Sequence, residues 1–462
     1  MNTESDTAHS LPRVLGARHA TAMVVGIVIG SGIFLVPREM IAAVGSSGQV
    51  YAVWIVGGLL SLFGALCYAE IAASRPAYGG EYAFLREAYG DLVGFLHMWT
   101  WWTIAKPASI ASVVSGLVRT LATFSTFAFF SNPAFLHMTW GQVAGLGALW
   151  LVTALDIYGT RKAANVQLGL TVLKVALIAV IAVCCFAFAG PLGSTSHFHS
   201  VFHGARGGVG GFMVALIAAL WAYDGWSDVA AVAGETKEPQ RNLPVAFIGG
   251  VLVVGGLYML TNAAIQFVLP AQALAVADRP AADALRLVLG THGIGWGAAL
   301  VSVGMAVSIS ATLVGTTLSG ARIGFAAARD RLFFSAIATV HPRLQTPATA
   351  LMVQSLLGSV LIFAIGRFQA LFSLAIFAEW LTYGLAVSTI FVFRQRDRCT
   401  ARPRAFSAPG YPVVPVLFIA AALALTVFQL VDDPRNTLLG CLVILCGVPM
   451  FYYFDRRRKH GA

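Results

Sequence analysis

The sequence VVGIVIGSGIF at residues 24–34 places a Gly-Ser-Gly triplet near the middle of an apolar run about as long as a membrane is thick. Glycine weakens a helix because it leaves the backbone free to adopt other conformations. A broken helix survives at membrane depth only where protein covers it or a polar cavity adjoins it. The stretch therefore predicts a membrane protein whose first span is interrupted beside such a cavity.

A second candidate break, WAYDGW at residues 221–226, lies at similar depth in the sixth apolar run. Each break has a simpler reading: Gly26 and Gly30 are spaced like a helix-packing seam, and Asp224 could pair with Lys174 or Lys106 inside the membrane. The first and sixth spans are, however, the corresponding helices of two five-span halves, an arrangement typical of transporters built from inverted repeats. That correspondence favours a transporter.

The composition sets the fold class. Hydrophobic residues make up 58% of the 462 positions and charged residues only 11%, whereas a soluble domain carries about 25% charge. Apolar runs of about 20 residues, the length of one membrane crossing, recur along the chain. We predict an all-α membrane protein with 12 transmembrane helices, in which a 5+5 inverted repeat with broken helices 1 and 6 precedes two C-terminal helices. The predicted spans are 20–44, 49–74, 94–118, 138–156, 164–189, 210–233, 244–268, 293–324, 346–365, 369–393, 412–430 and 437–454.

These spans divide the chain into five segments. The first 19 residues are polar and lack a cleavable signal pattern, so the first span is expected to act as the targeting signal. The segments are a cytoplasmic N-terminal stretch (1–19), the first repeat (20–189), the inverted second repeat (210–393), helices 11 and 12 (412–454) and a basic cytoplasmic tail (455–462).

The basic residues indicate orientation. With both termini inside, Lys and Arg favour the inner side by about three to one, as the positive-inside rule expects. We therefore expect a multi-pass protein of a bacterial-type inner membrane with both termini in the cytoplasm. Basic loops beside anionic lipid account for the net charge of +10, so the lipid bilayer is an expected partner and nucleic acid is not.

Cysteine and histidine usage predicts no cofactor and no metal. None of the six cysteines falls in an outside loop, so no disulfide is expected. Three histidines gather in the outside loop 191–204, where a solvated polar loop is the favoured reading over a metal site.

Chain direction suggests the ligand. The first span runs outward, so free N–H groups at Gly30–Gly32 begin its second half and suit an anion. The sixth span runs inward, so carbonyls near Trp221 and Ala222 end its first half and suit a cation. A zwitterionic α-amino acid satisfies both ends.

At these residues the chain resembles the amino acid–polyamine–organocation transporter superfamily, and within it the L-type amino acid transporter branch, over nearly its whole length. The similar motifs follow each other in the same order as in the family. They are GSGIF at 30–34, KPAS at 106–109, AYDGW at 222–226 with GETKEPQRNLP at 234–244, Arg322 with ARD at 328–330, WLTYG at 380–384, and Arg402-Pro403 with Tyr411-Pro412.

The resemblance implies roles for individual residues. Ser31 and Gly32 would bind the substrate carboxylate with Gly30 shaping the turn, and Trp221 would close the site from outside. Asp224 stands where many animal relatives have glycine. The residues expected to bind substrate are Val28, Ile29, Gly30, Ser31, Gly32, Ala105, Ser109, Trp221, Ala222, Asp224, Gly225, Trp226, Phe377 and Trp380.

Lys174 lies midway along the fifth span among apolar residues, so its ammonium needs a partner. The resemblance implies that it reaches carbonyls of the broken first span and a serine of span eight, with Ser308 the best match and Ser310 the second. Lys174 and Ser308 would then stand in place of the sodium ion used by sodium-coupled relatives.

The sequence thus predicts a secondary transporter, a sodium-independent exchanger of small neutral L-amino acids such as serine, threonine or alanine. A cationic amino acid or polyamine transporter is the alternative if Asp224 faces the substrate, and a non-transporting amino acid receptor would keep the same site. A membrane enzyme using Asp224, Lys174 or Glu379 lacks a clustered nucleophile, metal set or nucleotide loop. Animal relatives in the branch that the chain resembles use a cysteine of the outside loop 121–137 to attach a glycoprotein subunit. This chain has no cysteine there, so the comparison implies no disulfide-linked accessory subunit.

Overall fold

The computed structural model describes residues 11–198, 201–277, 279–364, 368–400, 404–432 and 434–459. Within these ranges the chain is helical without a β-strand, which confirms the predicted all-α class. The α-helices are α2 (Ala17–Val28), α3 (Gly32–Val44), α4 (Ser47–Ser74), α5 (Glu81–Tyr89), α6 (Asp91–Thr100), α7 (Lys106–Leu121), α8 (Trp140–Tyr158), α9 (Thr160–Ala187), α10 (Gly208–Tyr223), α11 (Pro239–Pro244), α12 (Gly250–Val268), α13 (Ala271–Val276), α14 (Pro280–Gly290), α15 (Gly297–Arg329), α16 (Ala348–Ala364), α17 (Phe368–Cys399), α18 (Val413–Asp432) and α19 (Pro434–Lys459). Single π-helical turns, η1 (Trp101–Ala105) and η6 (Val245–Gly249), continue α6 into α7 and α11 into α12.

Several of these helices are long and apolar enough to cross a membrane. Among the described residues, seven spans meet both requirements, and the bent pair α2–α3 makes an eighth. Each of the twelve predicted spans overlaps a helix or a run of consecutive helices. The chain is therefore a multi-pass membrane protein.

The first span is broken where the sequence predicts. Helix α2 ends at Val28 and α3 begins at Gly32, and the two axes are bent by 41°. The sixth span is broken as well: α10 ends at Tyr223, and the chain continues as the 3₁₀-helix η5 (Trp226–Glu235). Gly225 has a φ of 102°, and a Cβ on it would lie 2.5 Å from Ile27 Cγ2, so both conformation and space require glycine here.

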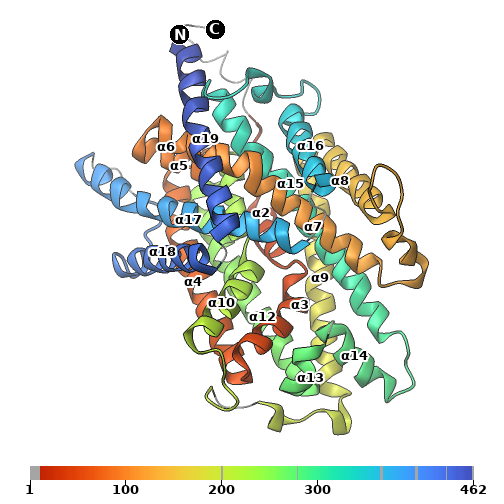
Figure 1. Cartoon of the computed structure of the whole chain (residues 1–462). Coiled ribbons are helices and arrows are strands. Elements are labelled where there is room, and N and C mark those ends of the chain that lie inside the picture. The colour runs from red at the N-terminus through yellow and green to blue at the C-terminus, as the bar shows by residue number, and fades with distance from the viewer. Residues whose placement is uncertain are drawn as a thin grey trace.

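The two broken helices lie at the centre of the bundle (Figure 1). Helix α2 packs against α9, α15 and η5, while α3 packs mainly against α10. The long helix α15 runs beside α7 and α9 and connects the surroundings of both breaks. Gly26 lies where α2 approaches α9, because a Cβ there would collide with Thr171 and Gln167. The packing-seam reading therefore holds for Gly26, whereas Gly30 lies in the break itself.

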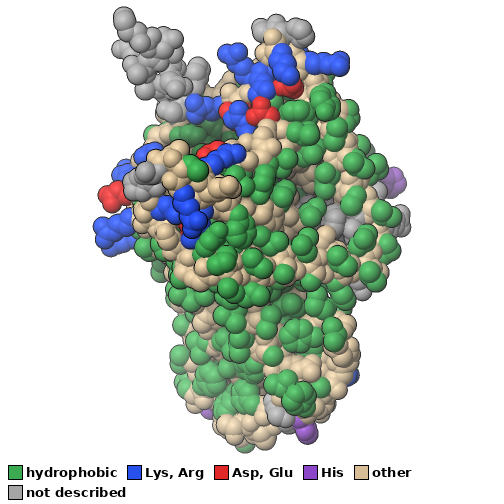
Figure 2. All heavy atoms as spheres, turned by 90° about the vertical axis from the view of Figure 1, so that its left-hand side faces the viewer, with side chains coloured by type: hydrophobic (Ala, Val, Ile, Leu, Met, Phe, Trp, Pro, Cys, Tyr) green, Lys and Arg blue, Asp and Glu red, His purple; other side chains and the backbone are tan. Residues whose placement is uncertain are grey.

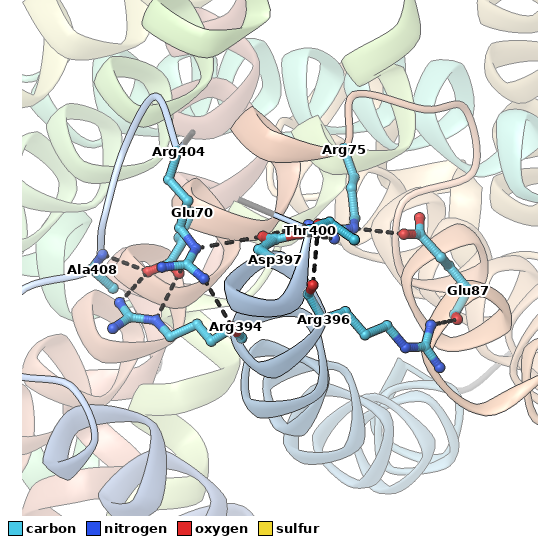
Figure 3. A network of polar contacts seen from close by, with 9 residues as sticks. All are labelled: Glu70, Arg75, Glu87, Arg394, Arg396, Asp397, Thr400, Arg404 and Ala408. Carbon is cyan, nitrogen blue, oxygen red and sulfur yellow. Dashed lines mark hydrogen bonds and ion pairs between the residues drawn. The ribbon is translucent and has the colours of Figure 1, made fainter. Parts of the chain in front are cut away.

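Charged side chains gather at one end of the molecule, while hydrophobic side chains cover most of the remaining surface of the face in Figure 2. The C-terminal end of α19 lies at this charged end (Figure 1). A buried network there joins α4, α17 and the segment before α18 (Figure 3). Glu70 accepts hydrogen bonds from Arg394 and from the Ala408 N–H, and Arg75 pairs with Asp397 at 2.7 Å.

Helices α5, α13 and α14 were not predicted as elements. They have 9, 6 and 11 residues, too short for the membrane-length periodicity on which the span prediction rests. Helix α5 packs against α6 and α17, and α14 packs against α15 and α9, so tertiary contacts rather than hydropathy stabilise them.

Candidate functional site

A cavity of about 60 Å³ lies between the two helix breaks. It is enclosed by the ends of α2, α3 and α10 together with facing stretches of α7 and α15. Its lining residues are Ile27, Val28, Gly30, Ser31, Gly32, Lys106, Ser109, Ser112, Val113, Trp221, Ala222, Asp224, Gly225, Asp228, Ile309, Thr312 and Thr316.

The first turn of α3 borders the cavity. Ser31 is the N-cap residue but makes no side-chain capping bond, and α3 begins at Gly32. N–H groups of a first turn have no partner within the helix and carry its positive dipole end. The Gly30 N–H donates to the Val28 carbonyl at 2.8 Å, so one of the donors expected at Gly30–Gly32 is already used. The remaining turn offers an anion-binding helix end.

The end of α10 faces the same cavity, and Tyr258 of α12 ties it to α2. The Tyr258 hydroxyl donates to the Ala222 carbonyl at 2.6 Å and lies 2.9 Å from the Val28 carbonyl. The Trp221 carbonyl accepts the Asp224 N–H at 3.2 Å. One phenol therefore sits between the two backbone breaks, a contact that sequence reasoning missed because Tyr258 lies in an otherwise ordinary apolar span.

Lys174 lies behind the break of the first span. Its Nζ donates to the carbonyls of Gly26 at 2.7 Å, Ile29 at 2.6 Å and Ser308 at 2.9 Å. The Ser308 hydroxyl donates to the Ile29 carbonyl at 2.7 Å. The lysine thus contacts the serine through its backbone, and both residues hold the last carbonyl before the break. Ser310 bonds within its own helix, to Ala306.

The charged side chains Lys106, Asp224 and Asp228 interact electrostatically at the cavity, but their hydrogen-bond partners differ. Lys106 Nζ pairs with Asp228 at 2.5 and 2.7 Å from its two oxygens, and both side chains are buried. Asp224 instead accepts a hydrogen bond from the Tyr383 hydroxyl at 2.9 Å. Lys106 bonds Asp228, and Lys174 bonds backbone carbonyls. Neither lysine therefore forms the direct pair with Asp224 that the simpler reading expects.

Some residues expected to bind substrate lie away from the lining. Trp226 packs edge-on against Tyr68 with ring centroids 4.9 Å apart, and Trp380 stacks on Phe418 at 5.7 Å. Ala105 is fully buried, and Ile29 gives its carbonyl to Lys174 and Ser308. The Phe377 side chain lies outside the described residues.

Sequence reasoning also missed part of the lining. Neither Lys106 nor Asp228 was predicted to line the site. Their ion pair joins positions 122 residues apart, which no local sequence pattern reveals. The lining positions on α7 could have been predicted from the sequence, because one helix face carries Lys106, Ser109, Ser112 and Val113 at helical spacing. The missed lining residues are Ile27, Lys106, Ser112, Val113, Asp228, Ile309, Thr312 and Thr316.

A second buried ion pair connects η5 to the neighbouring helices. Arg322 of α15 pairs with Glu235 at 2.8 Å, and both side chains are 0% exposed. The same guanidinium donates to Thr160 Oγ1 at 2.9 Å and to the Leu318 carbonyl at 2.7 Å. The Glu235 carbonyl accepts the Leu15 N–H at 3.0 Å, so the chain before α2 joins this contact.

Comparison with known proteins places this arrangement in a family. A model of the family described as amino acid permease matches residues 15–447. The chain is 32% identical to the serine/threonine exchanger SteT of Bacillus subtilis (strain 168), over 99% of this chain and 100% of that protein. It is 27% identical to the b(0,+)-type amino acid transporter 1 of Mus musculus, over 100% of this chain and 91% of the relative. It is also 28% identical to the mouse Asc-type amino acid transporter 1, over 96% of this chain and 81% of the relative. The chain thus belongs to the amino acid permease family of the amino acid–polyamine–organocation superfamily, and is a transporter rather than an enzyme.

Proposed function

We propose that this protein exchanges small neutral L-amino acids, of the serine, threonine and alanine type, by sodium-independent alternating access. The observation that carries the proposal is the cavity between the two breaks. The first turn of α3, with N–H groups at its start, and the last turn of α10, with carbonyls at its end, both line it. The Trp221 and Ala222 carbonyls each accept one hydrogen bond already, and a carbonyl oxygen has a second lone pair for a ligand. These two ends suit the carboxylate and the ammonium of one amino acid. Similarity to a serine/threonine exchanger supports the substrate class.

The size of the cavity favours small side chains. About 60 Å³ holds on the order of four to six waters at ~10–15 Å³ each, comparable to the six or seven non-hydrogen atoms of alanine or serine. Trp221 borders the cavity at the end of α10 and would close it on the outer side. Ser31, Gly32 and Ser109 would contact the substrate, whereas Trp226 and Trp380 would support the walls from behind.

The remaining parts of the proposal concern topology. In it, twelve spans include two inverted repeats, 20–189 and 210–393, so that the two breaks would fall in corresponding helices. Spans eleven and twelve, 412–454, follow the repeats. The end rich in Lys and Arg would face the cytoplasm (Figure 2), together with the segments 1–19 and 455–462, in a bacterial-type inner membrane. The protein would work without a disulfide-linked accessory subunit.

Counterflow in proteoliposomes tests the function. Vesicles loaded with unlabelled serine should take up external labelled serine, and threonine and alanine should compete better than leucine or phenylalanine. Empty vesicles should accumulate little label. Saturable binding without flux would identify a receptor instead, and uptake that requires no internal amino acid would contradict exchange.

Replacing Gly30 by alanine should weaken substrate binding while leaving the fold intact. A Cβ at Gly30 would meet only Thr312 Oγ1, at 3.5 Å, so the methyl group fits and occupies cavity space. An extra methyl group in a tight pocket costs about 1–3 kcal/mol, so we expect KM for serine to rise about tenfold or more. Concentration-dependent exchange measures it.

Gly32 is a poorer probe of the same carboxylate site. A Cβ there would lie 3.0 Å from Ala222 Cβ and 3.3 Å from the Trp221 ring, so Gly32→Val would also push α3 away from α10. An unchanged KM in Gly30→Ala would contradict the proposed site.

Transport of cationic amino acids is a second candidate because Asp224 borders the cavity and its hydrogen bonds join the Tyr383 hydroxyl and the Glu379 carboxyl rather than a cation. If Asp224 binds a substrate ammonium, Asp224→Asn should abolish competition by lysine or ornithine and spare serine exchange. Competition against labelled serine at fixed pH measures it, with Glu87→Gln of α5, whose carboxylate is 47% exposed, as a control that lies outside the cavity lining. Failure of lysine to compete in the wild type would exclude this candidate.

A further inference from the structure

A second cavity, of about 250 Å³, lies along the same helices as the first. On α7 the first cavity reaches Val113 and the second begins at Gly116, a rise of about 4.5 Å or nearly one helical turn. On α3 the lining passes from Gly32 to Leu35 in the same direction. The two cavities therefore succeed each other along one path.

The linings also continue on the same helix faces. Positions separated by three or four residues lie on one face of a helix, and both α7 and α15 follow this spacing through the two cavities. In order, the lining positions are Ser109, Ser112, Val113, Gly116, Arg119, Thr120 and Thr123 from α7 and its end, and Thr316, Thr312, Ile309, Met305 and Ser302 from α15.

Three arginines from separate elements distinguish the second cavity. Arg38 lies in α3 and Arg119 lies in α7, and Arg279 is the residue that precedes α14. Glu39 interacts electrostatically with Arg38 and Arg119, and Asp283 Oδ2 accepts the Arg279 N–H at 3.3 Å, so two carboxylates offset part of the charge. Among the described residues, the three guanidiniums still outnumber these two carboxylates. The lining of the first cavity has the opposite excess of charge, since it carries two carboxylates, Asp224 and Asp228, against one lysine, Lys106.

Hydroxyl groups stand beside the arginines. Thr120, Thr123 and Ser302 line the second cavity, and Thr123 Oγ1 donates to Ser302 Oγ at 3.2 Å. The Thr120 hydroxyl also donates to the Gly116 carbonyl at 2.9 Å, and the Thr123 hydroxyl lies 2.7 Å from the Thr120 carbonyl, so the arginines are the main donors to a ligand. Guanidinium groups bind carboxylates in a planar, two-point geometry. The lining thus suits a carboxylate and disfavours a free cation.

We propose that this second cavity is an entry site that holds the α-carboxylate of an amino acid arriving from outside. The inference rests on the proposed function and on the outward orientation of α13 and α14. The arginines draw the carboxylate, while the acidic balance of the first cavity draws the ammonium, so the zwitterion enters in one orientation. The carboxylate then moves about one helical turn to the N–H groups at the start of α3.

The test compares the two sides of the membrane. Neutralising all three arginines (R38Q/R119Q/R279Q) should raise the external KM for serine about tenfold, since charge-lined clefts raise association rates by 10-fold or more. The internal KM and kcat should stay within about twofold, because substrate from inside meets the first cavity first. Right-side-out and inside-out membrane vesicles supply the two values. Raising the salt to about 0.5 M should shrink the difference, as screening predicts.

Matched variants separate charge from structure. Arg286→Gln removes an exposed arginine of α14 that lies outside the cavity lining and should leave both KM values unchanged. Arg119→Lys keeps the charge and should retain most of the external affinity. The single variant Arg119→Gln, at an exposed residue, should raise the external KM about threefold and serves if the triple variant misfolds.

The remaining outcomes distinguish failure of the entry site from failure of the proposed function. Absence of serine exchange in the wild type would refute the proposed function itself. With active wild type, an unchanged external KM, or an equal rise on both sides, would overturn the entry site. Proteoliposomes with and without phosphatidylglycerol test a lipid source of the anion. A KM effect confined to vesicles containing that lipid would mean that the arginines hold a headgroup, which also overturns the proposal.

Discussion

Serine exchange by the wild-type protein should continue when choline replaces sodium, and Lys174→Ala should abolish exchange in both buffers. The Lys174 ammonium contacts three carbonyls, two of them at the end of α2 and one on α15. A metal cation bound at this position would make the same kind of contact with carbonyl oxygens. A fixed ammonium therefore holds the broken first span against α15 without an ion from solution.

The loss should appear in transport more than in folding. Without Lys174, the Ile29 carbonyl keeps a hydrogen bond from the Ser308 hydroxyl at 2.7 Å. The Thr312 hydroxyl lies 3.2 Å from the Gly26 carbonyl and 3.1 Å from the Ile27 carbonyl, and its one proton can serve only one of them. An unpaired buried carbonyl costs about 1–3 kcal/mol, so at most one such cost arises at the end of α2. We expect a folded protein whose α2 is no longer held in register with α15.

Matched variants make the measurement specific. Lys174→Met preserves volume while removing the charge and should also fail to exchange. Lys162→Ala changes a lysine in the first turn of α9 that lies over the ring of Tyr158, the last residue of α8, and it should exchange normally. Counterflow of labelled serine, with gel filtration as the check on folding, gives the result. Strict sodium dependence of the wild type, or full activity of Lys174→Ala, would contradict the proposed role.

Local rules were sufficient to predict the helix breaks. Gly-Ser-Gly at 30–32 and Asp-Gly at 224–225 interrupt apolar spans with residues that favour non-helical backbone, and the structure breaks at both places. The need of Lys174 for polar partners followed from the cost of burying a charge. These features depend on a residue and its own span, which the sequence displays directly.

Contacts between distant segments could not be predicted in the same way. Pairing of Lys106 with Asp228 depends on how η5 packs against α7. Trp226 was expected at the pocket, but it is the first residue of η5 and follows Asp224 in an extended and Gly225 in a left-handed conformation. These two backbone conformations precede a Trp226 side chain that packs against Tyr68 and Phe418. Hydropathy reveals where a span lies but not the backbone angles at its break.

Removing one partner of the Arg322–Glu235 pair should cause the largest loss of stability among these substitutions. Both side chains are 0% exposed, so Glu235→Gln leaves a buried guanidinium without its counter-charge. Breaking a fully buried pair in this way costs about 3–5 kcal/mol. We expect a markedly lower thermal midpoint, measured by heating the detergent-solubilised protein before gel filtration, together with loss of serine exchange.

A double variant separates the two effects. In E235Q/R322M neither partner of the pair is charged, and apolar replacement of a buried pair is often neutral for stability. Buried Asp156 loses its attraction to Arg322 in this variant, so the thermal midpoint should return part of the way toward that of the wild type. Exchange should stay impaired, because Arg322 also holds Thr160 of α9 and connects it through Glu235 to η5. Glu87→Gln is the control: its carboxylate is 47% exposed and pairs with Arg75 near the surface, so little change in midpoint is expected. Recovery of full exchange in the double variant would show that the pair contributes only to folding, whereas recovery of stability alone would assign it to holding η5 during the transport cycle.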